Sequence, residues 1–199
     1  MRRLVVATGN PHKVGELRAL CAGLPVEIVP IGVIAPDWHI EETGATFEQN
    51  ATLKARAAAS RSGEWALGDD SGLEVDALGG APGVKSARFA GGTGHDDAAN
   101  NRKLLALLAS VAAERRAARF RCVLALASPA GTLRTAAGVC EGWIALAPRG
   151  SGGFGYDPLF EVAEPGGRTM AELSPGEKNR VSHRARALAA LRPLVERIL

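Results

Sequence analysis

The sequence predicts an α/β protein in which a mixed central β-sheet is flanked by helices. Short apolar runs of strand length alternate with stretches whose apolar residues recur at helical spacing. One pair of apolar runs is separated by only a short turn, which is typical of an antiparallel hairpin and makes the sheet mixed. Hydrophobic residues make up 46% of the 199 residues and charged residues 23%, an ordinary globular composition. Because no change of composition marks a linker, we expect one domain over residues 1–199.

The first third of the chain predicts two strands and two helices in alternation. The expected elements, in order, are a strand over 4–8, a helix from Pro11 to about Gly23, a strand over 27–31 and a helix over 46–62. Asn10 predicts the N-cap of the first helix, with a proline in the first turn. Thr46 and Gln49 form a capping-box pattern before the alanine-rich second helix, and Gly63 is a typical stop signal. Residues 32–45 contain Gly, Pro and acidic residues and predict a loop.

The remaining two thirds predict a hairpin, further strands and two helices. The expected elements are strands over 65–68 and 73–78, a long helix capped by Asp96 or Asp97, hairpin strands over 120–127 and 133–140, a sheet continuation over 143–146, a strand over 159–162 and a terminal helix from about Ser182. The segment 69–72 separates the first two of these strands. Ser174 and Glu177 form a second capping-box pattern. Pro193 predicts a kink or the end of the terminal helix.

The junction after the first strand has the features of a phosphate site. It consists of Thr8, Gly9, Asn10, Pro11, His12 and Lys13. A glycine turn, free helix N-terminal amides and a lysine in one strand-to-helix junction suit an anionic phosphate. The glycine spacing of a Walker A loop is missing, so an ordinary capped helix stays open as the alternative.

Lysine is rare among the basic residues. Lys and Arg together number 24, and the lysines are Lys13, Lys54, Lys85, Lys103 and Lys178. A lysine gives a compact point charge for a phosphate oxygen, whereas arginine gives a planar fork. The lysine positions are therefore candidates for contacts to a phosphate chain.

Two pairs of carboxylates are candidates for a metal site. Glu41 and Glu42 lie in the predicted loop, and Asp69 and Asp70 end a predicted strand just before Ser71. Adjacent strand residues point to opposite faces, so only one of the two aspartates is expected to face a given site. Oxygen ligands without histidine or cysteine favour a hard cation, and Mg²⁺ with a polyphosphate is the commonest such pairing. Solvated loop acids and an Asx turn are the alternative.

A glycine-rich segment near the C-terminal third could hold a flat ligand. It contains Phe154, Gly155, the only tyrosine, Tyr156, and Asp157. Glycines let the backbone approach a planar group, an aromatic ring can stack on it, and a carboxylate can accept its hydrogen bonds. Lys178, His183 and Arg184 follow near the last helix and could donate to a base or a phosphate, although such a group is often only a solvated helix face.

Composition narrows the compartment and the partners. The three cysteines are scattered in apolar settings and predict neither a disulfide framework nor a metal site. The first apolar run is broken at Thr8 before it reaches the length of a signal peptide, and no stretch is long enough to cross a membrane. The net charge of +3 suits an anionic ligand but is too diffuse to indicate nucleic acid. We therefore expect a cytoplasmic protein without membrane or nucleic-acid partners.

Taken together and in this order, these segments resemble the inosine triphosphate pyrophosphatase family, also called the noncanonical purine or dITP/XTP pyrophosphatases. The resemblance spans nearly the whole chain. The segments that carry it are Thr8-Gly9-Asn10 with Lys13; Glu41-Glu42-Thr43-Gly44 with Phe47, Asn50 and Lys54-Ala55-Arg56; Asp69-Asp70-Ser71-Gly72-Leu73; Leu78-Gly79-Gly80-Ala81-Pro82-Gly83 with Ser86-Ala87-Arg88; Gly152-Gly153-Phe154-Gly155-Tyr156-Asp157-Pro158; and Lys178 with Ser182-His183-Arg184.

The resemblance implies an elongated α/β fold with two lobes around an active-site cleft, usually as a homodimer. It implies Mg²⁺-dependent hydrolysis of ITP, dITP or XTP between the α and β phosphates, giving a nucleoside monophosphate and pyrophosphate. By similarity, Glu41 and Asp70 bind Mg²⁺, and Asp70 is also the catalytic base. The implied substrate-binding residues are Thr8, Gly9, Asn10, Pro11, His12, Lys13, Lys54, Ser71, Phe154, Gly155, Tyr156, Asp157, Lys178, His183 and Arg184.

Two other functions stay open on the residues alone. Similar acidic and basic groups would serve a phosphatase that releases orthophosphate, or a pyrophosphatase of pyrimidine or common nucleotides. The basic composition and the pair Phe154 and Tyr156 would also suit a non-catalytic nucleotide-binding or RNA-binding module, with the two rings as a stacking platform. The acidic residues count against this module, because they would repel a phosphate chain unless a cation lay between them.

Overall fold

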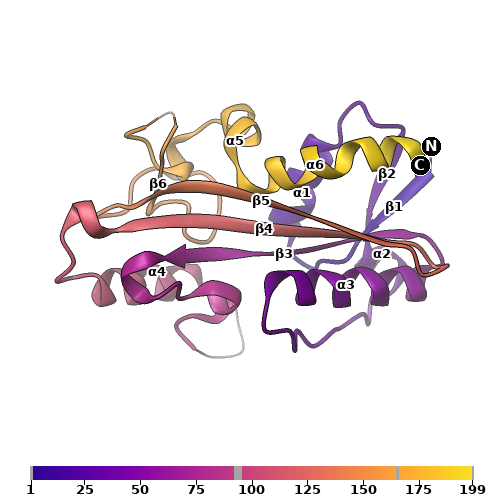
Figure 1. Ribbon diagram of the computed structural model, residues 1–199, viewed down its shortest axis with the longest axis horizontal. Coiled ribbons are helices and arrows are strands. Elements are labelled where there is room, and N and C mark those ends of the chain that lie inside the picture. The colour runs from indigo at the N-terminus through magenta and orange to yellow at the C-terminus, as the bar shows by residue number, and fades with distance from the viewer. Residues whose placement is uncertain (1, 92–95, 165, 199) are drawn as a thin grey trace. The chain divides into compact units, whose positions relative to one another are not determined.

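The computed structural model describes residues 2–91, 96–164 and 166–198 and contains a six-stranded sheet (Figure 1). The strands are β1 (Arg2–Val6), β2 (Val26–Pro30), β3 (Trp65–Val75), β4 (Ala117–Ala127), β5 (Leu133–Ile144) and β6 (Phe160–Val162). Their order in the sheet is β2-β1-β3-β4-β5-β6. β1 is parallel to β2 and to β3, whereas β5 and β6 are antiparallel, so the sheet is mixed as the sequence predicts.

The helices alternate with the strands in the first two thirds of the chain and follow them at the end. They are α1 (Pro11–Leu20), α2 (Ile31–Ile34), α3 (Phe47–Ser62), α4 (Asp97–Leu107), α5 (Pro175–Val181) and α6 (His183–Ile198). The Asn10 side chain accepts from the amides of His12 and Lys13, and the Thr46 side chain accepts from the Gln49 amide. The predicted helix caps are therefore confirmed at the start of both α1 and α3.

The chain divides into two compact units. Unit 1 consists of Met1–Asp70, Cys122–Gly138 and Arg184–Leu199, and unit 2 of Ser71–Arg121 and Val139–His183. Both units are built from separate stretches of chain, because β3, β4 and β5 each contribute residues to both. The expectation of one functional domain over the whole chain stays a prediction.

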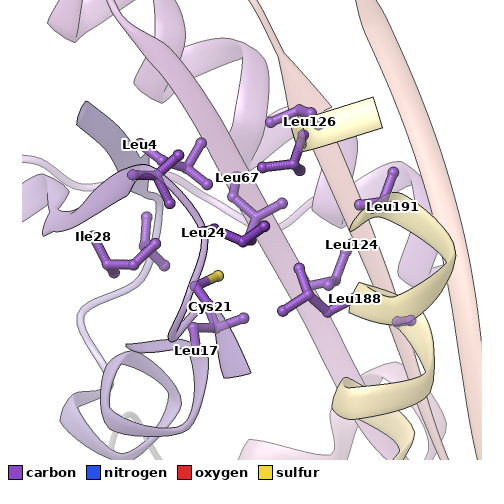
Figure 2. Close-up of a cluster of buried hydrophobic side chains, with 14 of the residues drawn as sticks. Leu4, Leu17, Cys21, Leu24, Ile28, Leu67, Leu124, Leu126, Leu188 and Leu191 are labelled. Carbon is purple, nitrogen blue, oxygen red and sulfur yellow. The ribbon is translucent and has the colours of Figure 1, made fainter. Parts of the chain in front are cut away.

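In unit 1, one face of the strands packs on α1 and α6. Leu4 and Val6 of β1 and Leu67 of β3 are fully buried in one cluster with residues of both helices (Figure 2). These strand residues are spaced two apart, as expected for side chains on one face of a sheet. From β4, Leu124 and Leu126 join the same cluster. This packing places the first turn of α6 and the start of α1 on the same face.

The opposite face of the unit 1 strands is covered by α3, which lies along them in Figure 1. The buried residues of α3 include Ala51, Ala55 and Ala58. A Cβ at Gly68 of β3 would collide with the Ala51 carbonyl oxygen and the Ala55 amide nitrogen. Small residues on both elements therefore allow the α3 backbone to approach β3 closely.

Unit 2 has a hydrophobic core of its own. It contains Leu73 and Val75 from β3, Phe120 from β4, Leu104 from α4 and Phe160 from β6. After α4, the buried Arg116 side chain donates to the carbonyls of Leu108, Val111 and Ala145, which satisfies backbone acceptors beyond the helix end.

Some predicted boundaries are wrong. The two strands expected around residues 69–72 are a single strand, β3, and residues 76–78 form a 3₁₀ turn. A strand can continue through the two aspartates because each has a cationic side chain beside it, so neither carboxylate needs water. A short helix, α2, occupies part of the predicted loop, and β5 extends without a break to Ile144. Likewise α6 continues past Pro193 to Ile198, so the proline does not end it.

Candidate functional site

Asp69 and Asp70 lie next to each other in β3 and are both buried, with 0% and 6% of their surfaces exposed. As successive strand residues they point to opposite faces of the sheet. Leu67, two residues before Asp69, faces α1 and α6, whereas Gly68, two residues before Asp70, faces α3. The two carboxylates therefore have different helices beside them.

Asp69 is held by two cations. Its Oδ1 accepts from Lys13 Nζ at 2.8 Å, and its Oδ2 accepts from Arg184 Nε at 2.6 Å. Arg184 is 1% exposed and also pairs with the Glu16 carboxylate of α1. Burial favours the protonated acid, but Arg184 and Lys13 outweigh it and hold the pKa of Asp69 well below its usual range. The charged form of the Asp69 carboxylate is thus favoured, and it is paired with two cations.

Asp70 lies on the α3 side and has a different environment. Lys54 Nζ donates to its Oδ1 at 2.8 Å, and Asn50 Nδ2 donates to its Oδ2 at 3.2 Å. Burial raises the pKa of Asp70 above its ordinary value, with a smaller contribution from Glu42, against the opposing effect of Lys54 and Lys13. A carboxylate with a raised pKa is a better proton acceptor near neutral pH. Two adjacent acids with pKa values shifted in opposite directions are the pattern expected of one structural and one reactive group.

Lys54 connects Asp70 to the acidic loop. Its Nζ donates to Glu42 Oε1 at 3.0 Å as well as to Asp70. Burial alone would lower the pKa of Lys54, but Asp70 and Glu42 hold it above its ordinary value, so its ammonium group stays charged. Glu41, the residue that the family resemblance favours, is exposed, and the carboxylate bonded to Lys54 is that of Glu42. The sequence identifies both Glu41 and Glu42 as candidate metal ligands, but it does not predict the ion pair between Glu42 and Lys54.

The predicted phosphate segment follows β1, which is parallel to β3 with Val6 opposite Leu67. This register places the residues after β1 beside Asp69, which explains how Lys13 in the first turn of α1 reaches it. The amides of His12 and Lys13 are not free, because both donate to Asn10 Oδ1 at 2.9 and 3.4 Å. The expectation of free helix amides is therefore wrong for these two groups.

In unit 2, Asp157 and Lys178 form a second buried ion pair. Lys178 Nζ donates to Asp157 Oδ2 at 2.6 Å, and the Phe154 amide donates to the same oxygen at 2.9 Å. The Lys178 ammonium group also lies 4.9 Å from the centre of the Phe154 ring. Gly155 donates its amide to Asp97 Oδ2 and accepts from Asn101 Nδ2. The predicted aromatic segment is thus held in place by side chains of α4 and α5.

Tyr156 and His183 are core residues of unit 2. The Tyr156 ring is 4% exposed, and its hydroxyl donates to the Ser86 carbonyl at 2.8 Å. The His183 ring is buried and stacks on Phe120, with ring centres 4.8 Å apart. Tyr156 therefore offers no face to a stacking base. Ser71 is half-buried in β3, at the first position of unit 2.

The predicted residues thus form two clusters, one in each unit. In unit 1 the structure joins Lys13 and Arg184 to Asp69 on one face of the sheet, and Lys54 to Asp70 on the other. In unit 2 it brings together Phe154, Asp157 and Lys178. Three of the rare lysines each pair with a buried aspartate. An ammonium group has three N–H donors, which is why Lys54 can bond the carboxylates of Asp70 and Glu42 at the same time.

No set of three or more His, Cys, Asp or Glu side chains among the described residues is arranged to hold a metal ion. Nor does any described helix combine the length and apolar character needed to cross a membrane.

Comparisons with known proteins point to the same family as the sequence motifs do. The model of the Ham1 family matches residues 4–194. A dITP/XTP pyrophosphatase of Desulforamulus reducens is 53% identical, covering 98% of this chain and 96% of that protein. The structure of a HAM1 protein from Coxiella burnetii is 43% identical with a TM-score of 0.87, covering 99% of this chain and all of that one. The structure of a nucleoside-triphosphatase / dITP/XTP pyrophosphatase from Mycobacterium abscessus is 48% identical with a TM-score of 0.75, covering 96% of this chain and 99% of that one. This chain therefore belongs to the Ham1 family.

Proposed function

We propose that this protein hydrolyses noncanonical purine nucleoside triphosphates, ITP, dITP and XTP, to nucleoside monophosphates and pyrophosphate. The observation that carries the proposal is the buried Asp70 carboxylate, whose pKa is raised and which is bonded to Lys54 and Asn50. Membership of the Ham1 family supports it, since relatives of about 50% identity are named dITP/XTP pyrophosphatase.

In this reaction Asp70 accepts a proton from the water that attacks the α phosphorus. Phosphoryl transfer needs charge neutralisation and an oriented nucleophile more than a covalent intermediate. Lys13 and Lys54 supply positive charge for phosphate oxygens, together with the segment from Thr8 to His12. Because both lysines are already paired with buried aspartates, their positions are fixed before a substrate arrives.

The donor set fits a magnesium ion. The acidic loop and Asp70 supply hard oxygen atoms close to each other, because the carboxylates of Asp70 and Glu42 both pair with the Lys54 ammonium group. Mg²⁺ usually keeps several waters and takes one or two carboxylates plus substrate phosphates, so two acids suffice. We propose Glu41 and Asp70 as its ligands. When bound, the ion would neutralise phosphate charge.

Phe154 to Asp157 are proposed to receive the base and the sugar. Recognition of the base and the phosphates is proposed to be completed by Lys178, His183 and Arg184. Phe154 is half-buried and supplies a ring face, Asp157 supplies an acceptor, and Lys178 holds both in place. The burial of Tyr156 counts against a two-ring stacking platform for RNA.

We further propose a cytoplasmic homodimer, which size-exclusion chromatography with light scattering would test.

The test is to incubate the purified protein with ITP, with and without Mg²⁺, and to resolve the products by ion exchange. We expect inosine monophosphate and pyrophosphate only with Mg²⁺, and little turnover of ATP. Release of inosine diphosphate and orthophosphate would place the cut at another bond. No turnover of any triphosphate would favour a binding module instead.

A further inference from the structure

The side-chain amide of Asn50 in α3 is bonded at both ends. Asn50 is 2% exposed; its Oδ1 accepts from the Gly44 amide at 2.7 Å, and its Nδ2 donates to Asp70 Oδ2 at 3.2 Å. A single buried side chain therefore joins the end of the acidic loop to the carboxylate of the proposed base.

Gly44 is required for this contact. A Cβ at position 44 would lie 2.5 Å from Asn50 Oδ1 and 2.9 Å from the Asn50 backbone nitrogen. The second of these atoms belongs to the helix backbone and cannot move aside. Only a glycine therefore lets the loop reach the Asn50 side chain.

Lys54 makes a second connection between the same two partners. It lies four residues after Asn50, so the two side chains share one face of α3. Lys54 Nζ donates to Asp70 Oδ1 and to Glu42 Oε1, while Asn50 bonds Asp70 Oδ2 and the Gly44 amide. Both oxygens of Asp70 are thus oriented from α3, and the loop is bonded to α3 on both sides of Thr43.

The two hydrogen bonds of the Asn50 side chain require an amide, which accepts from the Gly44 amide and donates to Asp70. An aspartate would still accept from the Gly44 amide, but it would lose the donor and place a like charge beside Asp70. A leucine of similar shape would make neither hydrogen bond.

We propose that Asn50 is a positioning residue that fixes the loop 41–44 and the Asp70 carboxylate relative to each other. This inference rests on the proposed function, because its consequence is a fixed spacing between Glu41 and Asp70, the proposed ligands of Mg²⁺. Partners that orient metal ligands typically change metal affinity or activity by about 10–100-fold when they are replaced.

The experiment compares Asn50→Asp and Asn50→Leu with the wild type in the full chain. We expect both variants to lose about 10–100-fold in kcat with ITP and Mg²⁺. Amide hydrogen exchange separates the two bonds: Gly44 exchanges faster in Asn50→Leu but near the wild-type rate in Asn50→Asp. Gln49→Leu is the matched control, because Gln49 Oε1 accepts from the Ala45 amide at 2.7 Å, and the residue is exposed. We expect it to speed exchange at Ala45 and leave kcat unchanged.

Wild-type kcat in both Asn50 variants, or unchanged Gly44 exchange in Asn50→Leu, would overturn the inference. If the wild type itself hydrolyses no triphosphate, the proposed function fails separately. The positioning role is then judged by the rise in Tm that Mg²⁺ alone causes, which Asn50→Asp should weaken and Gln49→Leu should not. If a variant fails to fold, Gly44→Ala tests the same contact with Asn50 in place, and normal kcat in it would count against the proposal.

Discussion

At the scale of single residues, the neighbouring side chains give two chemically identical aspartates different properties. Asp69 is bonded to Arg184 and Lys13, and its pKa is held low; Asp70 is bonded to Lys54 and Asn50, and its pKa is raised. Folding therefore favours the charged form of Asp69 and disfavours the charged form of Asp70. A carboxylate whose charged form is disfavoured by the fold, such as Asp70, is a better candidate for a catalytic group than one whose charge stabilises the fold, such as Asp69.

Replacing each aspartate by asparagine should separate these properties. Asp69→Asn removes the carboxylate that Arg184 and Lys13 share and leaves Arg184 with Glu16 alone, and removing one partner of a buried pair costs about 3–5 kcal/mol. Asp70→Asn should fold normally, with Lys54 still bonded to Glu42, but lose about 10²–10⁴-fold in kcat as expected for a general base. Urea unfolding and ITP turnover measure the two effects. Substantial turnover in Asp70→Asn would remove the residue from both the metal site and the base role.

At the scale of elements, the site depends on how closely α3 approaches β3. Lys54 and Asn50 reach Asp70 because Gly68 admits the α3 backbone. Helix caps set where other candidate site residues lie. Asn10 starts α1 so that Lys13 is in its first turn, and the Ser174–Glu177 capping box starts α5, which contains Lys178.

Gly68→Ala should therefore reduce both stability and activity. The new Cβ would meet backbone atoms of Ala51 and Ala55, and such overpacking typically costs about 1–3 kcal/mol. Displacement of α3 would also misplace Lys54 and lower kcat. Gly15→Ala is the control, because Gly15 lies in α1 and a Cβ added there would have no atom within 4 Å. Alanine in place of glycine should stabilise that helix by about 0.5–1 kcal/mol. Equal urea midpoints for the two variants would contradict the role of Gly68.

The capping box of α5 predicts a pH dependence of stability. Hydrogen bonds from Arg168, and then from the Ser174 amide and hydroxyl, lower the pKa of Glu177 from 4.5 to about 2. A lowered pKa means that the stabilisation is present above pH 4.5 and is lost as the pH falls toward 2. The difference in urea midpoint between the wild type and Glu177→Gln should therefore shrink over this interval. A difference that does not change with pH would show that the charge of Glu177 is not the cause.

At the scale of the whole molecule, the residues proposed to contact the substrate belong to two groups, each of which lies within one unit. The residues proposed to bind phosphate and metal lie in unit 1, and Phe154, Asp157 and Lys178 lie in unit 2. Arg184 belongs to unit 1, where Asp69 and Glu16 accept hydrogen bonds from its guanidinium group. We predict that Arg184 also donates to the 6-oxo group of the purine, in addition to holding Asp69 through its ion pair.

Selectivity between inosine and adenine nucleotides tests this assignment. A site whose donors match a 6-oxo group leaves them unpaired against a 6-amino group, which can give about 10⁴-fold discrimination in the best cases. If Arg184 is such a donor, Arg184→Ala should lose far more turnover of ITP than of ATP, measured as kcat/KM for each. Equal losses would mean that Arg184 acts only by holding Asp69. Lys13→Ala, which removes the other cation on Asp69, is the control for that indirect effect.

The ordered motifs of the sequence identified the family by resemblance. Local signals predicted the mixed α/β sheet and most elements, because caps, periodicity and turns act over a few residues. The Thr46 and Asn10 caps and the Ser174–Glu177 capping box are at their predicted positions. Those signals also identified Lys13, Lys54, Asp157 and Lys178 as members of polar clusters, although their roles stay predictions.

Tertiary structure alone decided how the two aspartates differ, which loop acid contacts Lys54, and that Tyr156 lies in the core. Each of these depends on a partner far away in the chain: Asp69 is bonded to residues 56 and 115 positions away, and Tyr156 to a carbonyl 70 positions away. Strand alternation shows that the two aspartates face opposite sides, but only packing shows which helix covers each side. The electrostatic environment that raises one pKa and lowers the other is created when those helices pack on the sheet.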